Sequence, residues 1–299
     1  MCGIVGLFVK NPDQCASLGA NLSRMLIGMT DRGPDSAGIA VYHDPSEAGW
    51  CKLTLFHPDE SYGWRAMAGE LAAALGEETD VSLKANHAVL SAEAEEGAVR
   101  AWLAEHHPEV RIMGYGTLME VYKDKGKPAS VVDKYGIAAM AGTHGIGHTR
   151  MATESAVTTE HSHPFTAAAD MCLVHNGSLS NHNRLRLWLQ RRGQTFESDN
   201  DTEVAARYFA HRLGEGASLR EAMEAGLKDL DGFYTFAMGT RDGFAVLRDG
   251  IACKPAVLAE TDNWVAMASE YRSLAGLPGV EAARVWEPEP AVIYNWSLN

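Results

Sequence analysis

The chain has 299 residues, of which 46% are hydrophobic, which is enough to bury a sizeable core and typical of a globular protein. Lys and Arg number 26 against 39 Asp and Glu, and the net charge of −13 excludes nucleic acid and anionic membrane surfaces as expected partners, because both repel an acidic protein. No run approaches the roughly 18 apolar residues of a membrane helix, and the start lacks the pattern of a secretory signal, so we expect a cytoplasmic protein.

The predicted elements favour a layered α+β fold. The apolar run 3–9 predicts a strand, the apolar spacing of three and four over 15–29 predicts an amphipathic helix, and the run 36–42 predicts a buried strand. Further strands are predicted at 146–151, 171–175, 234–239, 244–248, 256–259, 264–268 and 291–294, and helices at 183–192, 202–213 and 219–230. Because short connections between consecutive strands favour antiparallel pairing, we expect antiparallel sheets packed with helices.

The composition changes between about 57 and 140, where Glu and Ala become frequent. A strand at 82–92, a helix at 95–106 and a strand at 111–121 are predicted there, and a charged turn at 123–128 is expected to close the region. This pattern indicates an inserted, mostly solvated α/β subdomain within one domain that spans 1–299.

Five scattered cysteines argue against a disulfide framework or a cysteine-bound metal. Their number is odd, and no C-x-x-C spacing occurs among Cys2, Cys15, Cys51, Cys172 and Cys253. The sequence therefore predicts no iron–sulfur cluster, zinc or other cofactor in this chain.

Cys2 stands directly after Met1, at the start of the first predicted strand. A cysteine near an N-terminus is usually a small hydrophobic residue without a chemical role. Removal of Met1 would instead give the thiol a base of its own, since a free α-amine has a pKa of about 7.7–8.0 and can take the thiol proton. A thiol with a neighbouring amine is suited to nucleophilic cleavage of an amide.

Three polar clusters, at 32–36, 145–153 and 175–181, interrupt the apolar pattern at strand ends or loops. Asn176-Gly177 is a common turn dipeptide, because both residues tolerate positive φ. An Asn side-chain N–H and a Gly backbone N–H can also converge on one oxygen and form an oxyanion hole. Both interpretations remain open for this pair on its own.

Arg150 and Asp201 also have two interpretations each. Arg150 ends an apolar strand, where it would be either a surface residue or a bidentate donor to a carboxylate. Asp201 begins a predicted helix, where an acid favours the helix dipole and could equally complement an ammonium group. An arginine and an aspartate together satisfy the two charges of a free amino acid.

The histidines of the same region suggest a metal hydrolase as a rival hypothesis. None of the spacings is that of H-x-x-x-H on a helix or of H-E-x-x-H, and several of the residues adjoin glycines or prolines in loops, so metal ligation is disfavoured. They are His144, His148, His161, His163, His175 and His182.

Short motifs along nearly the whole chain together resemble the class II glutamine amidotransferases, N-terminal-nucleophile enzymes that hydrolyse glutamine to glutamate and ammonia. The motifs are MCGIVG at 1–6, RGPDS at 32–36, GHTR at 147–150, HP at 163–164, HNG at 175–177, DTE at 201–203, DG at 231–232 and ASE at 268–270. The resemblance implies a four-layer αββα sandwich of two antiparallel sheets.

The resemblance also implies roles for single residues. Cys2 would be the nucleophile and its α-amine the base, Asn176 and Gly177 would form the oxyanion hole, and Arg32 would help to hold the N-terminal segment. Arg150 would bind the glutamine carboxylate.

The remaining implied substrate-binding residues are Asp201, for the glutamine amine, and Thr153. Many members of the family have Trp after the Arg and His-Gly after the Ala-Thr, whereas this chain has Met151 and the pair 154–155. These departures concern the shape of the glutamine pocket and its closing loop.

The resemblance is strongest to stand-alone glutaminase subunits of glutamate-synthase-like complexes, among them the amidotransferase-type subunit of N-methylglutamate synthase. The chain ends at Asn299 without an ammonia-consuming domain, so we expect partner subunits that carry FMN and an iron–sulfur cluster. Two alternatives are an independent hydrolase of another γ-glutamyl amide and a catalytically silent scaffolding subunit.

Overall fold

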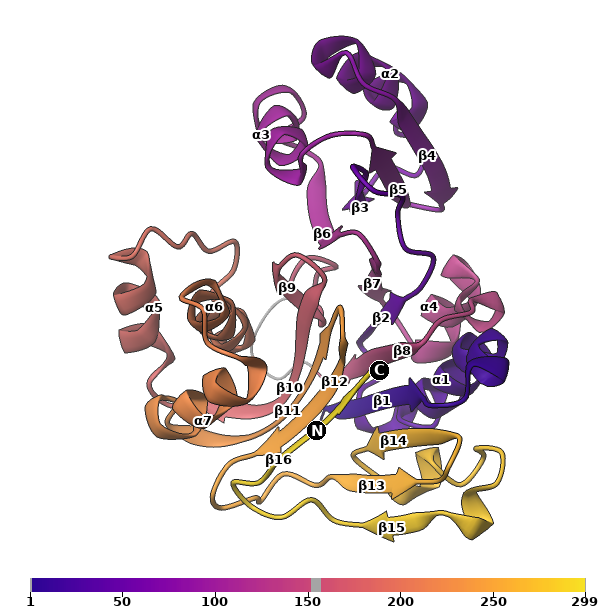
Figure 1. Cartoon of the computed structure of the whole chain (residues 1–299), viewed down its shortest axis with the longest axis vertical. Helices are drawn as coiled ribbons and strands as arrows, with labels where there is room; N and C mark the ends of the chain where they lie inside the picture. Colours follow the sequence, from indigo (N-terminus) through magenta and orange to yellow (C-terminus); the bar gives the residue numbers. More distant parts are fainter. Residues whose placement is uncertain (1, 152–156, 299) are drawn as a thin grey trace.

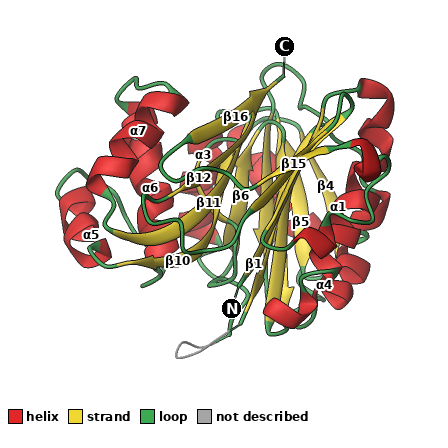
Figure 2. Cartoon of the chain, turned by 90° about the horizontal axis from the view of Figure 1, so that it is seen from below, coloured by secondary structure: helices red, strands yellow, loops and turns green. Residues whose placement is uncertain are grey.

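Two antiparallel sheets packed face to face form the body of the chain (Figures 1 and 2). The computed structural model describes residues 2–151 and 157–298. The first sheet consists, in spatial order, of β15 (Arg284–Trp286), β13 (Val257–Glu260), β14 (Trp264–Ala268), β1 (Gly3–Val9), β8 (His144–Arg150), β2 (Ser36–Tyr42) and β7 (Met119–Lys125). The second consists of β16 (Ile293–Ser297), β12 (Gly243–Arg248), β11 (Gly232–Thr240), β10 (Met171–Leu179) and β9 (Phe165–Ala168).

Helices cover the outer face of each sheet, which completes four layers (Figure 2). On the first sheet lie α1 (Leu18–Ile27) and α4 (Pro128–Tyr135), and on the second lie α5 (His182–Gln190), α6 (Asp201–Gly214) and α7 (Leu219–Asp229). The expected α+β fold, a four-layer αββα sandwich of antiparallel sheets, is confirmed.

The strands at the centre of the sandwich are apolar on both faces because both faces are covered. All seven residues of β1 are buried: Val5 and Leu7 pack towards α1, whereas Ile4 and Phe8 face the second sheet. Gly6 also lies between the sheets, where a Cβ atom would come within 2.5 Å of the ring of Phe244. The absence of a side chain at this position lets the two sheets approach closely.

A third sheet projects from the sandwich (Figure 1). Its strands, in spatial order, are β4 (Thr79–Lys84), β5 (His87–Ala92), β3 (Cys51–Phe56) and β6 (Arg111–Gly116), and α2 (Trp64–Leu75) and α3 (Glu96–His106) pack with them around a separate core. The sequence predicts an insertion at about 57–140, but this sheet begins at Cys51 and ends at Gly116. The later part of that range, with β7 and α4, belongs to the main sandwich.

Two predicted strands of this region are each divided by a tight turn. The segment 82–92 contains the end of β4 and all of β5, with Ala85 at a φ of 53° in the turn between them. The segment 111–121 contains β6 and the start of β7, separated after Gly116, where a Cβ would lie 2.2 Å from the carboxylate of Asp170. That carboxylate accepts hydrogen bonds from the backbone N–H groups of 117–119, which holds the chain in the turn.

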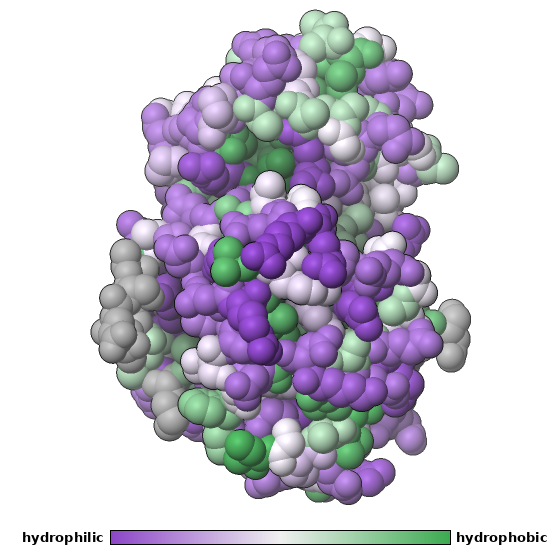
Figure 3. All heavy atoms as spheres, turned by 90° about the vertical axis from the view of Figure 1, so that its left-hand side faces the viewer, coloured by the Kyte–Doolittle hydropathy of each residue, from purple (hydrophilic) through white to green (hydrophobic). Residues whose placement is uncertain are grey.

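None of the helices within 2–151 and 157–298 is both long enough and apolar enough to cross a membrane. Seen from the side of α5, the surface is mainly hydrophilic, with small and separate hydrophobic spots (Figure 3). Single exposed apolar residues of this kind are ordinary on protein surfaces.

The close contact at Gly6 gives a test of the packing between the two sheets. We expect Gly6→Val to lower the free energy of unfolding by about 1–3 kcal/mol or more, because the added atoms overfill a well-packed interface. Gly69→Ala is the control, since Gly69 is exposed within α2, has open space around it, and should gain up to about 1 kcal/mol from helix propensity. Equal urea denaturation midpoints for the two variants would contradict this packing.

Candidate functional site

Cys2 lies at the open end of β1, directly before a strand that is paired on both sides. Gly3 is opposite Thr149 of β8, and Val5 is opposite Ala268 of β14. A Cβ at Gly3 would stand 2.8 Å from Thr149 Oγ1 and 2.9 Å from Met29 Cβ, so only glycine lets the chain reach this depth. The half-buried Cys2 therefore has a defined position at the edge of the sandwich.

Two side chains from distant parts of the sequence donate to the backbone carbonyl of Cys2. Arg32 Nε lies 2.9 Å from this oxygen, and Asn176 Nδ2 lies 3.2 Å from it. Arg32 is itself buried and forms an ion pair with Glu270, with 2.7 Å between Nη1 and Oε1. Hydrogen bonding from Arg32 lowers the pKa of Glu270, so this carboxylate is charged at neutral pH.

Ser269 and Glu270, for which the sequence indicates only a matching motif and no role, also hold the N-terminal strand. Ser269 Oγ accepts a hydrogen bond from Ile4 N at 3.0 Å, and Ser269 N donates to Ile4 O at 3.0 Å. Glu270 acts through Arg32. The sequence marks Ser269 and Glu270 only by their motif at the end of a predicted strand. The residues they bind, Ile4 and Arg32, are more than 200 positions away in the sequence.

Asn176 and Gly177 lie inside β10, not in a turn. The predicted strand 171–175 continues to Leu179, and the pair is opposite residues 234–235 of β11, so the turn interpretation is wrong. Gly177 has a φ of +150°, and a Cβ there would lie 2.0 Å from the carbonyl oxygen of Phe233. Glycine is therefore required by the backbone at this position.

Asp201 is the first residue of α6, as its position before a predicted helix suggests. The helix is capped by Asn200, whose side chain accepts from Thr202 N, so Asp201 is not needed as the cap. Asp201 Oδ2 accepts a hydrogen bond from Leu179 N of β10 at 2.9 Å, and Oδ1 lies 3.7 Å from His175 Nδ1. Burial opposes ionisation, but the contact with His175 and the hydrogen bond from Leu179 outweigh it and lower the pKa of Asp201 to about 2.

Arg150 is the last residue of β8 and is opposite Ser36 of β2. Its side chain is largely buried, which disfavours the surface interpretation, and Nη1 donates to the carbonyl of His161 at 3.5 Å. The turn at 32–34 packs on its backbone, since a Cβ at Gly33 would be 2.5 Å from Arg150 N. Thr153, predicted to contact substrate, lies outside the described residues, as does the departure at 154–155.

Two of the histidines pack against each other, and one of them contacts the backbone of β10 at a third. The rings of His148 and His163 are 3.9 Å apart between centroids, and His148 Nε2 lies 3.0 Å from the carbonyl oxygen of His175. Burial lowers the pKa of His148 to about 3 and that of His163 well below its usual value, so both are neutral. Within the described parts of the chain, no three His, Cys, Asp or Glu side chains are arranged to hold a metal ion.

The contacts bring several of the predicted residues to one end of the sandwich. Asn176 is linked to Cys2 by its hydrogen bond to the Cys2 carbonyl. Arg150 lies beside Cys2, because the residues next to them, Gly3 and Thr149, are paired between β1 and β8. Asp201 accepts a hydrogen bond from the backbone of β10 at a residue three positions after Asn176. The site combines a thiol, a side-chain amide donor, a guanidinium and a carboxylate, the groups required to bind an amino acid and attack its carbonyl.

Known proteins are similar to this chain along nearly its whole length. A family model described as a glutamine amidotransferase domain matches residues 148–276. The chain is 54% identical over 297 residues to the glutamine amidotransferase-like protein GlxB of Rhizobium meliloti, with 99% of this chain and 98% of that protein covered. It is 34% identical over 309 residues to a putative glutamine amidotransferase of Methanothermobacter thermautotrophicus, with 99% and 100% covered.

A solved structure shares the fold. The glutamine phosphoribosylpyrophosphate amidotransferase from B. subtilis superimposes with a TM-score of 0.64 at 18% identity, with 99% of this chain and 47% of that one covered. At this identity the likeness concerns the fold alone, and the chain spans about half the length of that enzyme. The two full-length relatives decide the family: the chain belongs to the glutamine amidotransferases.

Proposed function

We propose that this chain hydrolyses L-glutamine to glutamate and ammonia through Cys2, after removal of Met1. The observation that carries the proposal is the pair of hydrogen bonds from Arg32 and Asn176 to the Cys2 carbonyl, at 2.9 Å and 3.2 Å. They would hold the first residue of the processed chain directly beside the proposed oxyanion-hole residue.

The reaction follows from the chemistry of these groups. The Cys2 thiol loses its proton to the α-amine, and the sulfur attacks the side-chain amide carbon of glutamine. The amine returns the proton to the departing nitrogen, which leaves as ammonia, and water then cleaves the γ-glutamyl thioester to give glutamate. Asn176 and Gly177 would stabilise the oxyanion of both tetrahedral intermediates. An Asn amide has two N–H bonds, so donation to the Cys2 carbonyl uses only one of them.

The substrate's own charges are matched by Arg150 and Asp201. The guanidinium suits a bidentate contact with the α-carboxylate, and the carboxylate suits the α-ammonium group. With a pKa of about 2, Asp201 keeps its charge throughout the neutral range, so amine recognition would not titrate there. Thr153 would complete the pocket.

We further propose that the ammonia passes to a glutamate-synthase-like partner, with N-methylglutamate synthase as the specific candidate. The support is the order of motifs from 1–6 to 268–270, which resembles the glutaminase subunits of such complexes. FMN and an iron–sulfur cluster would belong to the partner subunits and not to this chain. The reducing cytoplasm is the proposed location, and it suits the five free cysteines.

Replacement of the nucleophile is the first test. Cys2→Ala should abolish ammonia release from glutamine, because no other group in the proposed mechanism forms the thioester, while the circular dichroism spectrum and melting temperature remain those of the native protein. Glutaminase activity retained in the purified variant would overturn the proposal.

Loss of the oxyanion donor should affect the chemical step. Asn176→Ala is expected to lower kcat by roughly 10²–10³-fold, as for other oxyanion-hole donors, with a smaller change in KM. Asn181→Ala is the matched control, since Asn181 also makes side-chain hydrogen bonds, to the backbone of Asp229 and Asp231, but does not contact Cys2. Equal kcat values for the two variants would contradict the role of Asn176.

The partner can be tested by purification of the tagged chain from its native cells. The recovered complex should show flavin absorbance and faster glutamine hydrolysis than the isolated chain. Full activity of the isolated chain on another γ-glutamyl amide, without a co-purifying subunit, would favour the independent hydrolase. A complex that never releases ammonia from glutamine would favour the silent scaffold.

A further inference from the structure

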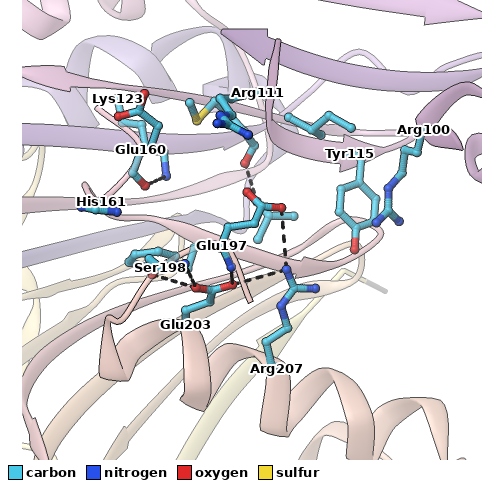
Figure 4. Close-up of a pocket in the computed structure, with 14 residues that line it drawn as sticks. Arg100, Arg111, Tyr115, Lys123, Glu160, His161, Glu197, Ser198, Glu203 and Arg207 are labelled. Carbon is cyan, nitrogen blue, oxygen red and sulfur yellow. Dashed lines mark hydrogen bonds and ion pairs between the residues drawn. The ribbon is translucent and has the colours of Figure 1, made fainter. Parts of the chain in front are cut away.

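The segment 158–164 leads into β9, and two adjacent residues of β7 hold it from one side. These residues are Lys123 and Asp124. Figure 4 shows the first of them beside Glu160 of the segment. The sequence predicts a charged surface turn at 123–128, but β7 continues to Lys125, and both side chains are buried. Buried charges are costly unless their hydrogen bonds are satisfied, so their partners are informative.

Lys123 directs its ammonium group into the backbone of this segment. Nζ donates to the carbonyls of Glu160 at 3.1 Å, Ser162 at 2.9 Å and Pro164 at 3.2 Å. An ammonium group has three N–H bonds, and each has a carbonyl acceptor here. Burial lowers the pKa of Lys123 to about 8, which leaves the group mainly charged at neutral pH.

The strand beside Lys123 leaves room for the segment. Gly38 of β2 is opposite Lys123, and a Cβ at Gly38 would stand 2.0 Å from the carbonyl oxygen of His163. The backbone of the segment therefore lies directly on β2 and β7.

Asp124 holds the start of the same segment. Its Oδ1 accepts a hydrogen bond from Thr159 Oγ1 at 2.8 Å, and its Oδ2 accepts from Lys134 Nζ at 2.9 Å and Tyr135 OH at 3.0 Å. Burial opposes its ionisation, but the contacts with Lys134 and Thr159 lower the pKa of Asp124 to about 2. The carboxylate is thus a charged link between α4 and the segment.

The segment in turn contacts Arg150. The carbonyl of His161, which lies between two of the carbonyls held by Lys123, accepts from Arg150 Nη1 at 3.5 Å. Arg150 is on β8, and β2 separates it from β7 in the sheet. The segment thus reaches from Lys123 and Asp124 on β7 to the guanidinium of Arg150 on β8.

We infer that Lys123 and Asp124 are positioning residues for glutamine binding. By fixing the backbone of 158–164, they hold the His161 carbonyl where it orients the Arg150 guanidinium for the substrate carboxylate. The inference rests on the proposed function of Arg150, but the fixing of the segment stands on its own contacts and can be measured separately.

The test uses the full chain carrying Cys2→Ala, so that glutamine binds without turnover. Lys123→Met should raise the Kd for glutamine by roughly 10–100-fold, as expected for the loss of hydrogen bonds made by a charged group. It should also speed amide hydrogen exchange in 158–164. Thr159→Val, a milder change that removes one hydrogen bond to Asp124, should shift both readouts in the same direction, and it keeps the inference testable if Lys123→Met fails to fold.

Lys52→Met is the matched control. Lys52 is equally buried, and its Nζ donates to the carbonyls of His43 and Asp44 and to Glu120. These partners lie by the Tyr42 end of β2, whereas Arg150 pairs at the Ser36 end, about 20 Å away along the strand. Lys52→Met should therefore change the Kd for glutamine by no more than about twofold, because distant sites act independently.

Several outcomes would overturn the inference. Unchanged exchange in 158–164 after Lys123→Met would show that the lysine does not fix the segment. Faster exchange with a Kd no higher than in Lys52→Met would show that the segment does not position Arg150. If Cys2→Ala alone fails to bind glutamine, the proposed function is contradicted, and hydrogen exchange alone decides whether the segment is held.

Discussion

The position of the Cys2 backbone carbonyl is the constraint on which the site depends. One oxygen accepts from Arg32 and Asn176, residues 30 and 174 positions away in the sequence, and thereby joins the first sheet to the second. Arg32 is kept in place by its ion pair with Glu270, and β1 is fixed by its pairing with β8 and β14. Cys2, which lies close to a chain end and so in a part that is normally mobile, is thus tied to both sheets.

The sequence predicts the central strands well because their physical signal is local. The segments 3–9 and 36–42 are continuous apolar runs, and each is a buried strand with those bounds, covered on both faces by a sheet and a helix layer. The residues gathered around Cys2 were also proposed from sequence, since thiol, amide, guanidinium and carboxylate groups occurred at strand ends. Periodicity and residue chemistry therefore sufficed for a layered α+β fold and for the chemical groups of the candidate site. The four-layer αββα arrangement and the role of each residue followed only from the resemblance to the class II glutamine amidotransferases.

Features that depend on long-range partners were not predictable. Lys123 and Asp124 belong to a run of charges that is typical of a solvated turn, yet they are buried, because carbonyls of 158–164 and the hydroxyl of Thr159 satisfy them. Asn176-Gly177 has turn composition but continues a strand, because it pairs with residues 234–235 of β11. In each case the decisive partner lies more than 30 residues away, beyond the reach of a local pattern.

A free α-amine on Cys2 is the central requirement, and mass spectrometry after reaction with an electrophilic glutamine analogue tests it most directly. Active native protein should have an intact mass that lacks one methionine, and the analogue should modify the sulfur of an N-terminal Cys2 with a free amine. Active protein that retains Met1, or a label attached to a different residue, would contradict the account.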